Sequence, residues 1–200
     1  MIIRKLFKAK STHLVRNCYS ERCKFSIHSH TGIIEVFLEA NKLDNAGMIV
    51  DFGVLKNEVK DFIDSFDHAY LLWNKESDDY KQFIYNNSDR WIELPMSPSA
   101  ESLAVIMLYV IDKILCKTQL NNNEGEITVR SVRYHETATG YAEAFLSDFH
   151  MMIPYSPSDI IISDSIQQEW KNKNMWNELI MDRECLVDSF IYDKPIQQIK

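Results

Sequence analysis

The chain has 200 residues, of which 46% are hydrophobic and 12% aromatic, with only five glycines and five prolines. This composition suffices for a domain with a sizeable core and argues against disorder. The net charge of −7 argues against nucleic-acid binding as a main function, and no apolar run reaches the ~20 residues needed to cross a bilayer. Because the N-terminal residues lack the long apolar centre of a signal peptide, we expect a cytoplasmic protein without a membrane or nucleic-acid partner.

Strands are expected at the start of the chain. Residues 2–9 and 27–40 are predicted as strands, because apolar residues in the second recur at every other position from Ile34 to Leu38. A polar turn at 44–47 and a short strand at 48–51 are expected to follow.

Two helices are expected in the middle of the chain. Residues 54–66 carry an apolar stripe at helical spacing. A second helix is predicted at about 98–116, with Ser97 as its N-cap and Pro98 at its first position. After a polar turn, strands are expected at 126–136 and about 140–146. The order is therefore β-β-α-α-β-β, which predicts an α+β fold.

Two segments lie outside this pattern. The stretch 69–96 is a long insertion before the second helix, and residues 147–200 form a C-terminal extension. We expect residues 1–146 to form the main domain and the extension to pack on it or at a subunit interface. Four apolar residues of the extension suggest helix, although Trp176 and the polar run 172–174 interrupt the stripe: Ile166, Trp170, Leu179 and Ile180.

Basic residues concentrate at the N-terminus. Residues 1–24 carry a net charge of +6, so the remainder carries −13. Such a segment would suit a polyanionic small molecule such as a triphosphate, and is equally typical of a solvated basic strand and loop.

The four cysteines have no regular framework spacing, which fits reduced thiols: Cys18, Cys23, Cys116 and Cys185. Cys18 and Cys23 could form half of a zinc site, but the chain has no second pair of suitable spacing.

The pattern His28-Ser29-His30, with His13 fifteen residues upstream, has the composition of a metal site. Side chains alternate faces along a strand, so histidines at i and i+2 can share one metal. A third histidine would complete a site with an open position for water or substrate, as in catalytic zinc centres. An isolated His-x-His pattern is more often two polar residues at a strand edge, so the rest of the sequence must show whether these histidines form a metal site.

Other chemical residues follow in a definite order. The motifs are His13; Cys23 with His28-Ser29-His30; Asn45-Ala46-Gly47-Met48-Ile49-Val50-Asp51-Phe52; Asp67-His68; Pro98-Ser99-Ala100-Glu101; and His135-Glu136-Thr137. Over about residues 2–146 the chain resembles the 6-pyruvoyltetrahydropterin synthase / 6-carboxytetrahydropterin synthase family, in which these motifs occur in this order. Family members usually read His-Gly-His where this chain has Ser29. A serine on the opposite strand face would leave the metal undisturbed, unless the family glycine serves a positive φ.

The resemblance implies a fold and an assembly. It implies the tunnelling fold, an antiparallel sheet with two helices on one face. Such a sheet has edges that neighbouring subunits can complete. The family forms β-barrels from several subunits, with active sites at subunit interfaces, so the resemblance implies a homo-oligomer, a hexamer of two trimers.

The resemblance also implies roles in catalysis. His13, His28 and His30 would hold Zn²⁺, which would polarise the carbonyl of a hydroxyketone side chain on a pterin. Cys23 would be the general base, preferred to Cys18 because it lies close to where the family carries its cysteine. A thiol near a dication has a depressed pKa, although a single cysteine is more commonly buried and inert.

Asp67 and His68 would act with the thiol from a neighbouring subunit, where a carboxylate can orient a histidine and raise its pKa. Alternatively, these two residues have no role in catalysis and are a helix cap and a surface carboxylate. Glu136 would accept two hydrogen bonds from the 2-amino and ring N–H groups of the pterin. Glu101, with Ser99, matches a second pterin-pocket position, and could equally favour the dipole at a helix start.

The resemblance therefore predicts a zinc-dependent lyase acting on 7,8-dihydroneopterin triphosphate. The expected product is 6-carboxy-5,6,7,8-tetrahydropterin, with release of acetaldehyde and triphosphate, for queuosine-type biosynthesis. The alternatives are 6-pyruvoyltetrahydropterin formation by triphosphate elimination, which uses the same groups, and a non-catalytic pterin-binding protein. The presence of every motif together argues against the last.

Overall fold

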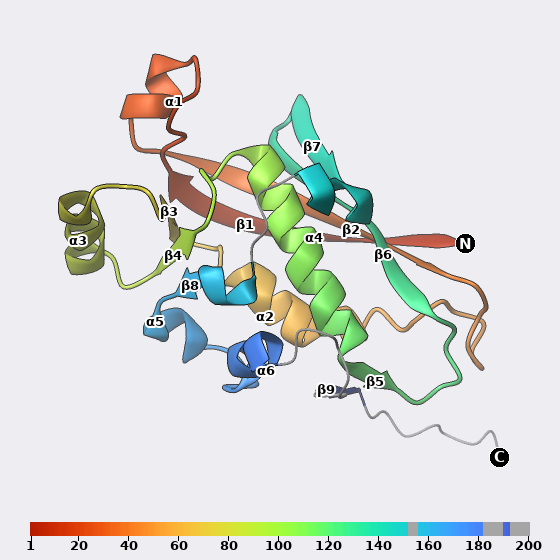
Figure 1. Cartoon of the computed structure of the whole chain (residues 1–200). Helices are drawn as coiled ribbons and strands as arrows, with labels where there is room; N and C mark the ends of the chain where they lie inside the picture. The colour runs from red at the N-terminus through yellow and green to blue at the C-terminus, as the bar shows by residue number, and fades with distance from the viewer. Residues whose placement is uncertain (152–155, 182–189, 193–200) are drawn as a thin grey trace.

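A seven-stranded sheet organises the protein, as the computed structural model shows for residues 1–151, 156–181 and 190–192. Its strand order is β7-β6-β2-β1-β3-β4-β8 (Figure 1). Four strands in one half of the sheet run antiparallel to one another: β1 (Ile2–His13), β2 (His28–Ala40), β6 (Ile127–Thr137) and β7 (Gly140–Ala144). This half of the sheet corresponds to the four strands predicted at the two ends of the β-β-α-α-β-β order.

Strand β1 is longer than the alternation of its apolar residues predicts. It runs past residue 9 to His13, because β2 pairs with its whole length, from Ile2 opposite Glu39 to His13 opposite His28. Its last two residues also pair in parallel with Tyr70 and Leu71 on the far side. The polar run before His13 has no strand signal of its own, so pairing on both sides supplies what the sequence pattern lacks.

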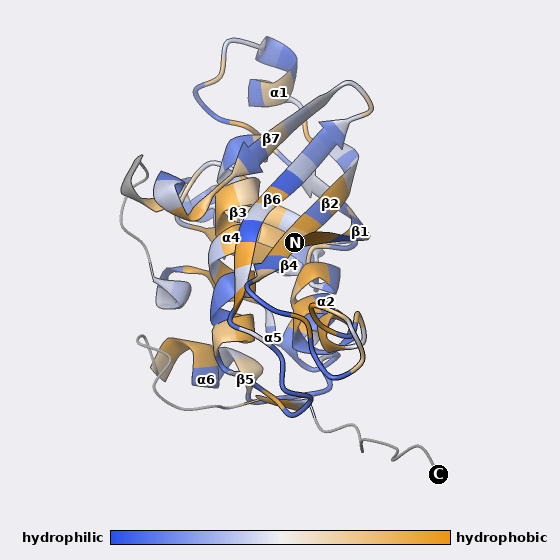
Figure 2. Ribbon diagram, turned by 90° about the vertical axis from the view of Figure 1, so that its right-hand side faces the viewer, coloured by the Kyte–Doolittle hydropathy of each residue, from blue (hydrophilic) through white to orange (hydrophobic). Residues whose placement is uncertain are grey.

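Two helices cover one face of the sheet, α2 (Glu58–Asp64) and α4 (Ala100–Cys116) (Figure 1). Their apolar residues pack with those of the central strands in one core, and Figure 2 shows apolar residues along both helices. The face predicted for the second helix is confirmed, since five of its residues are at most 1% exposed: Leu103, Met107, Val110, Ile111 and Ile114.

Three local expectations are wrong. The helix predicted at 54–66 is divided into a 3₁₀ turn (Val54–Lys56) and α2, because Asn57 between them has φ −103° and ψ −119°. The strand expected at 48–51 is absent, and the Asp44 carboxylate instead accepts the backbone N–H groups of Ala46 and Met48 in a tight turn. Helix α4 begins at Ala100, with Ser99 rather than Ser97 as its N-cap.

The insertion forms β3 (Tyr70–Trp73), α3 (Asp78–Asn87) and β4 (Trp91–Leu94). Its strands extend the sheet in parallel beyond β1. Leu71 belongs to the main core, whereas Tyr70 and Leu72 pack with Ile84 of α3 in a separate cluster. Because neighbouring side chains of a strand face opposite ways, α3 lies on the sheet face away from α2 and α4.

The C-terminal extension contributes β8 (Ile161–Ile162), which pairs with β4, and two short helices, α5 (Asp164–Gln167) and α6 (Met175–Met181). Ile166 and Leu179 lie in these helices as expected, whereas Trp170 lies between them. The indole Nε1 of Trp170 donates to Ser65 Oγ at 2.8 Å, beside α2. These buried side chains belong to the same core as the sheet.

Shorter elements complete the described chain: η2 (Leu146–Met151), η3 (Pro157–Asp159), and a two-stranded sheet of β5 (Thr118–Leu120) and β9 (Phe190–Tyr192). Cys185 lies outside the described residues. Within those residues, no helix has the length and apolar character that a membrane span requires.

Candidate active site

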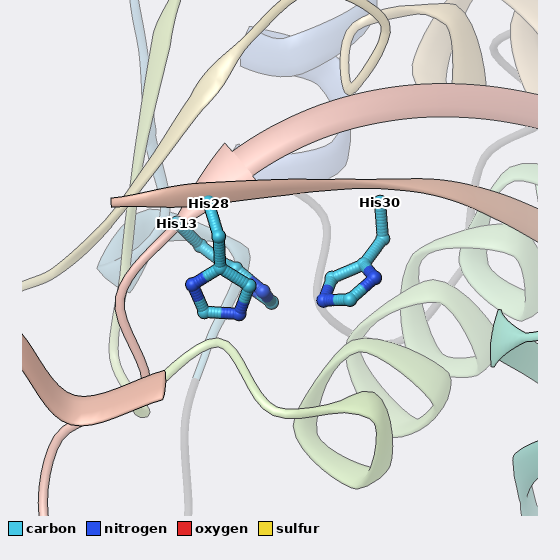
Figure 3. Close-up of side chains that lie close together, drawn as sticks. All are labelled: His13, His28 and His30. Atoms are coloured by element: carbon cyan, nitrogen blue, oxygen red, sulfur yellow. The ribbon is translucent and has the colours of Figure 1, made fainter. Parts of the chain in front are cut away.

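Three histidines meet at one end of the sheet. His13 is the last residue of β1 and faces His28, the first residue of β2, while His30 follows two residues later on the same face. Their ring centroids lie 4.6 to 5.4 Å apart, and one nitrogen from each lies within 4.8 Å of the others. Figure 3 shows His28 and His30 extending side by side from one strand, with His13 reaching toward them from the next.

Two of the rings are held by backbone carbonyls. His13 Nδ1 lies 2.8 Å from the carbonyl oxygen of Pro98, and His28 Nδ1 lies 2.8 Å from that of Ser26. A carbonyl only accepts, so each Nδ1 carries a proton, and in the neutral form of such a ring Nε2 keeps its lone pair. Histidines that bind metals are oriented by this kind of contact.

The Nε2 atom of His13 is buried and has no hydrogen-bond partner. Buried polar atoms are rarely left unsatisfied, so this nitrogen calls for a ligand in the space between the rings. Three imidazole donors around that space fit a divalent metal ion with an open coordination position.

The pKa of His13 is lowered to about 4, first because the side chain is buried and then because His28 and His30 lie beside it. Its hydrogen bond to the Pro98 carbonyl acts in the opposite direction. The ring is therefore neutral at physiological pH, the form that coordinates a metal.

Glu136 of β6 lies at the rim of the cluster. Its Oε1 is 3.6 Å from His13 Nε2 and 3.8 Å from His30 Nε2, so the carboxylate is close to both rings without a hydrogen bond to either. Its side chain is 30% exposed, which leaves it open to an incoming molecule. The sequence motif around Glu136 predicts a pterin contact, and the fold places that carboxylate beside the three histidines.

Tyr134 and Gly32 form the neighbouring part of this face. A Cβ added to Gly32 would lie 2.6 to 2.9 Å from the hydroxyl oxygen and two ring carbons of Tyr134, so the tyrosine occupies the space that a side chain would need. Burial raises the pKa of Tyr134, while its hydrogen bond with Ser11 acts in the opposite direction. The tight fit fixes β6, and with it Glu136, against the histidine-bearing strand.

Ser29, which replaces the usual family glycine, lies between the two histidines on the other strand face. Its Oγ lies 2.7 Å from Thr12 Oγ1. Positive φ angles among non-glycine residues of the described chain occur at Asn17, His68 and Asn123, so Ser29 occupies ordinary extended backbone. The substitution therefore leaves the histidine face unchanged.

Cys23 lies on α1 (Glu21–Phe25), a short helix in the connection from His13 to His28 (Figure 1). Its carbonyl accepts the backbone N–H of Val15 at 2.9 Å, which holds the helix to the end of β1. The Cys18 thiol donates to the Ser20 carbonyl at 3.3 Å and is thus bound within its own loop. Among the described residues, the group of side chains that could hold a metal ion consists of the three histidines. The thiols of Cys18 and Cys23 are not part of this group.

Asp67 and His68 lie beside β1 rather than at the histidine cluster. Asp67 Oδ1 accepts the backbone N–H of Lys10 at 2.7 Å, and the backbone N–H of His68 donates to the Lys10 carbonyl at 2.6 Å. His68 has φ +56°, and its ring is 75% exposed, with Nε2 3.8 Å from Asp67 Oδ2. The ring is thus largely exposed.

Ser99 and Glu101 lie at the start of α4. Ser99 Oγ accepts the backbone N–H of Ser102 at 3.3 Å, so it caps the helix. Glu101 is exposed in the first turn. The adjoining carbonyl of Pro98 holds His13, so the residues at the start of α4 do contact the site.

Two basic residues of β1, Lys8 and Lys10, are exposed on the strand face opposite His13, because their positions alternate with it.

Residues 2–146 match the sequence model of the 6-pyruvoyl tetrahydropterin synthase family. The chain belongs to this family. Over their full lengths the chain is 44% identical to the 6-carboxy-5,6,7,8-tetrahydropterin synthase of Helicobacter pylori strain J99.

Solved structures support the family fold. An uncharacterized protein from Wolinella succinogenes, 20% identical, superposes with a TM-score of 0.55 over 73% of this chain and 98% of its own. The 6-pyruvoyl tetrahydropterin synthase of Caenorhabditis elegans, 17% identical, gives 0.51 over 72% of this chain and 94% of its own. Both likenesses confirm a mixed α and β family fold with a mainly antiparallel sheet.

Two contributors to the site have no sequence signal of their own. The Pro98 carbonyl acts through its backbone, which no side-chain pattern reveals. In the sequence, Tyr134 is indistinguishable from the other apolar residues of its strand. Its role in holding β6 against the histidine-bearing strand is visible only from its packing over Gly32. A glycine inside a predicted strand was the available clue, because such a residue often marks a close approach.

Proposed function

We propose that this chain converts 7,8-dihydroneopterin triphosphate to 6-carboxy-5,6,7,8-tetrahydropterin, with release of acetaldehyde and triphosphate. The observation that carries the proposal is the buried, unpartnered Nε2 of His13, which faces two further imidazoles beside Glu136. Family membership and the full-length Helicobacter pylori relative support this choice of reaction.

Zinc is the proposed metal. Neutral imidazoles of His13, His28 and His30 suit it, and a fourth position would remain open. When bound, the ion supplies Lewis acidity to the adjacent hydroxyl and keto oxygens of the substrate side chain.

Glu136 is the proposed pterin anchor. Its two carboxylate oxygens can accept hydrogen bonds from the 2-amino and ring N–H groups, a planar bidentate match. Its position next to His13 and His30 would put the pterin side chain at the cluster. Glu101 and Ser99 are proposed as a second part of the pterin pocket, at the helix start whose Pro98 holds His13.

Cys23 is proposed as the general base, and His68 with Asp67 as the second proton-handling pair. A base must come within hydrogen-bond reach of the proton it removes. Since His68 is exposed and lies away from the cluster of its own chain, we propose that a neighbouring subunit supplies it. The exposed apolar side chains of Tyr19, Phe25 and Ile27 around Cys23 support such a contact.

The proposed assembly is a homo-oligomer, a hexamer of two trimers in which sheets join into barrels. Two edges are available for that pairing: β7, an end strand of the sheet, and the first part of β1, which β3 does not reach on the side opposite β2. The proposed pathway is queuosine-type biosynthesis in the cytoplasm.

The test is to incubate zinc-loaded protein with 7,8-dihydroneopterin triphosphate and to identify the pterin product by mass. The carboxy-tetrahydropterin is expected, and a 6-pyruvoyltetrahydropterin product would replace the proposed reaction by triphosphate elimination. Absence of turnover would refute the enzymatic proposal.

Matched histidine variants test the metal site. His28→Ala should remove most of the roughly one zinc per chain that we expect. His135→Ala should retain it, because His135 contacts Glu35 at 3.4 Å on the other face of the sheet. Equal zinc content in the two variants would contradict the assignment.

A further inference from the structure

Arg16 connects its own loop to two other segments of the chain, the insertion and helix α1. It lies three residues after His13, in the connection that leads to Cys23. Its Nε and one terminal nitrogen donate to the two carboxylate oxygens of Glu76, at 2.7 and 3.1 Å. Its other terminal nitrogen donates to the carbonyl of Lys24 at 2.8 Å. A single guanidinium therefore bonds both the insertion and the residue next to Cys23.

The geometry depends on an arginine. The planar guanidinium presents donors in fixed directions, so it can grip a carboxylate with two of them and a carbonyl with a third. Lysine could not reproduce this, because its ammonium is a point charge. The side chains of Arg16 and Glu76 are only 25% and 10% exposed, so water screens the pair less than a surface ion pair.

Glu76 is itself held by the insertion. It lies in the turn after β3, where its backbone N–H donates to the Trp73 carbonyl at 3.0 Å. The Arg16 guanidinium also lies 5.5 Å from the ring centroid of Tyr80 on α3. The Tyr80 hydroxyl lies 2.6 Å from that of Tyr70, which is in the strand beside β1.

The segment carrying Cys23 has little other support. Helix α1 spans five residues and buries none of them. A helix this short is not stable alone. Its attachments to the body include the Val15 bond to the Cys23 carbonyl and the Arg16 bond to the Lys24 carbonyl. These bonds act on the backbone directly at the thiol-bearing residue.

We propose that Arg16 and Glu76 are positioning residues, which brace the Cys23 segment against the insertion and fix the thiol relative to the three histidines. The inference rests on the proposed function in taking Cys23 as the base. The insertion formed by β3, α3 and β4 thereby takes part in the site, although it contributes no group to the reaction. Because effective catalysis depends on near-attack geometry, looser placement of the base lowers kcat more than it raises KM.

The experiment compares Glu76→Gln with Glu143→Gln in the full-length protein. Glu143 makes a similar partly buried pair with Arg133, at 2.9 Å on the far side of the sheet. In metal-free protein, Glu76→Gln should speed hydrogen exchange of peptide 14–27 and alkylation of Cys23 by iodoacetamide about tenfold, since charge-assisted bonds are lost. Exchange in β6 should stay unchanged, and Glu143→Gln should leave peptide 14–27 as in the wild type.

Activity supplies the second measurement. In zinc-loaded protein, Glu76→Gln should lower kcat about tenfold with little change in KM. Arg16→Gln should have the same effect, and the double variant should be no worse than either, since both remove one interaction. Unchanged exchange at 14–27, faster exchange throughout the protein, or unchanged kcat would overturn the proposal. If the wild type itself lacks turnover, the proposed reaction fails, while exchange and alkylation still decide whether the brace exists.

Discussion

Acid should destabilise the metal-free protein through His13. Burial lowers the pKa of this ring to about 4 in the folded state, from 6.5 in an exposed histidine. The unfolded chain therefore binds the proton more tightly than the folded chain. As the pH falls, protonation lowers the free energy of the unfolded state more than that of the folded state. The stabilisation is complete above about pH 6.5 and is lost as the pH falls toward 4, with a total of about 3 kcal/mol at roughly 1.36 kcal/mol per pKa unit.

Urea unfolding with a chelator present, at about pH 7 and about pH 4, measures this difference. His13→Gln removes the titrating group, so its unfolding free energy should fall by about 3 kcal/mol less than that of the wild type over this interval. The carboxylates of the protein titrate in both forms and cancel in the comparison. Equal losses in the two proteins would refute the argument that the folded state excludes the proton from His13.

Two further predictions concern packing and assembly. Gly32→Ala should lower the free energy of unfolding by about 1–3 kcal/mol, because the new Cβ would overlap the Tyr134 side chain. Gly140→Ala should be nearly neutral, since the closest contact of its new Cβ would be 3.5 Å. Equal effects of the two substitutions in urea unfolding would contradict the argument that Tyr134 fills the space beside Gly32. Cys23→Ala and His68→Ala should each be inactive yet complement when mixed under subunit exchange, with about a quarter of sites whole, whereas Cys18→Ala should stay active alone. Mixed oligomers without activity above either parent would place both residues in one chain.

The histidine cluster could be predicted because it depends on short-range rules. Alternation along β2 sets His28 and His30 on one face whatever the rest of the chain does. Bringing His13 to them requires only that β1 pair with β2, and the resemblance indicated that these three act together. The helix face of residues 98–116 follows for the same reason, since its apolar spacing is local.

The insertion could not be predicted in this way. Its strands β3 and β4 have four residues each, too few for alternation to distinguish them from a loop. Strand β3 pairs in parallel with β1, and β4 pairs in parallel with β3, so their place in the sheet depends on contacts distant in sequence. The break at Asn57 is likewise invisible to an apolar stripe, because the stripe continues across it while the backbone changes direction.

These two kinds of element meet at the site. The histidines of the cluster come together through strand alternation and pairing, but backbone carbonyls orient two of the rings: that of Pro98 before α4 orients His13, and that of Ser26 after α1 orients His28. Helix α1 in turn is held through Arg16 to a turn of the insertion. Substitutions in the insertion should therefore act on catalysis through the segment that carries Cys23, and on the proposed metal site only through the Ser26 carbonyl that contacts His28. Substitutions next to Pro98 should act on the proposed metal site itself, because that carbonyl sets the tautomer of His13.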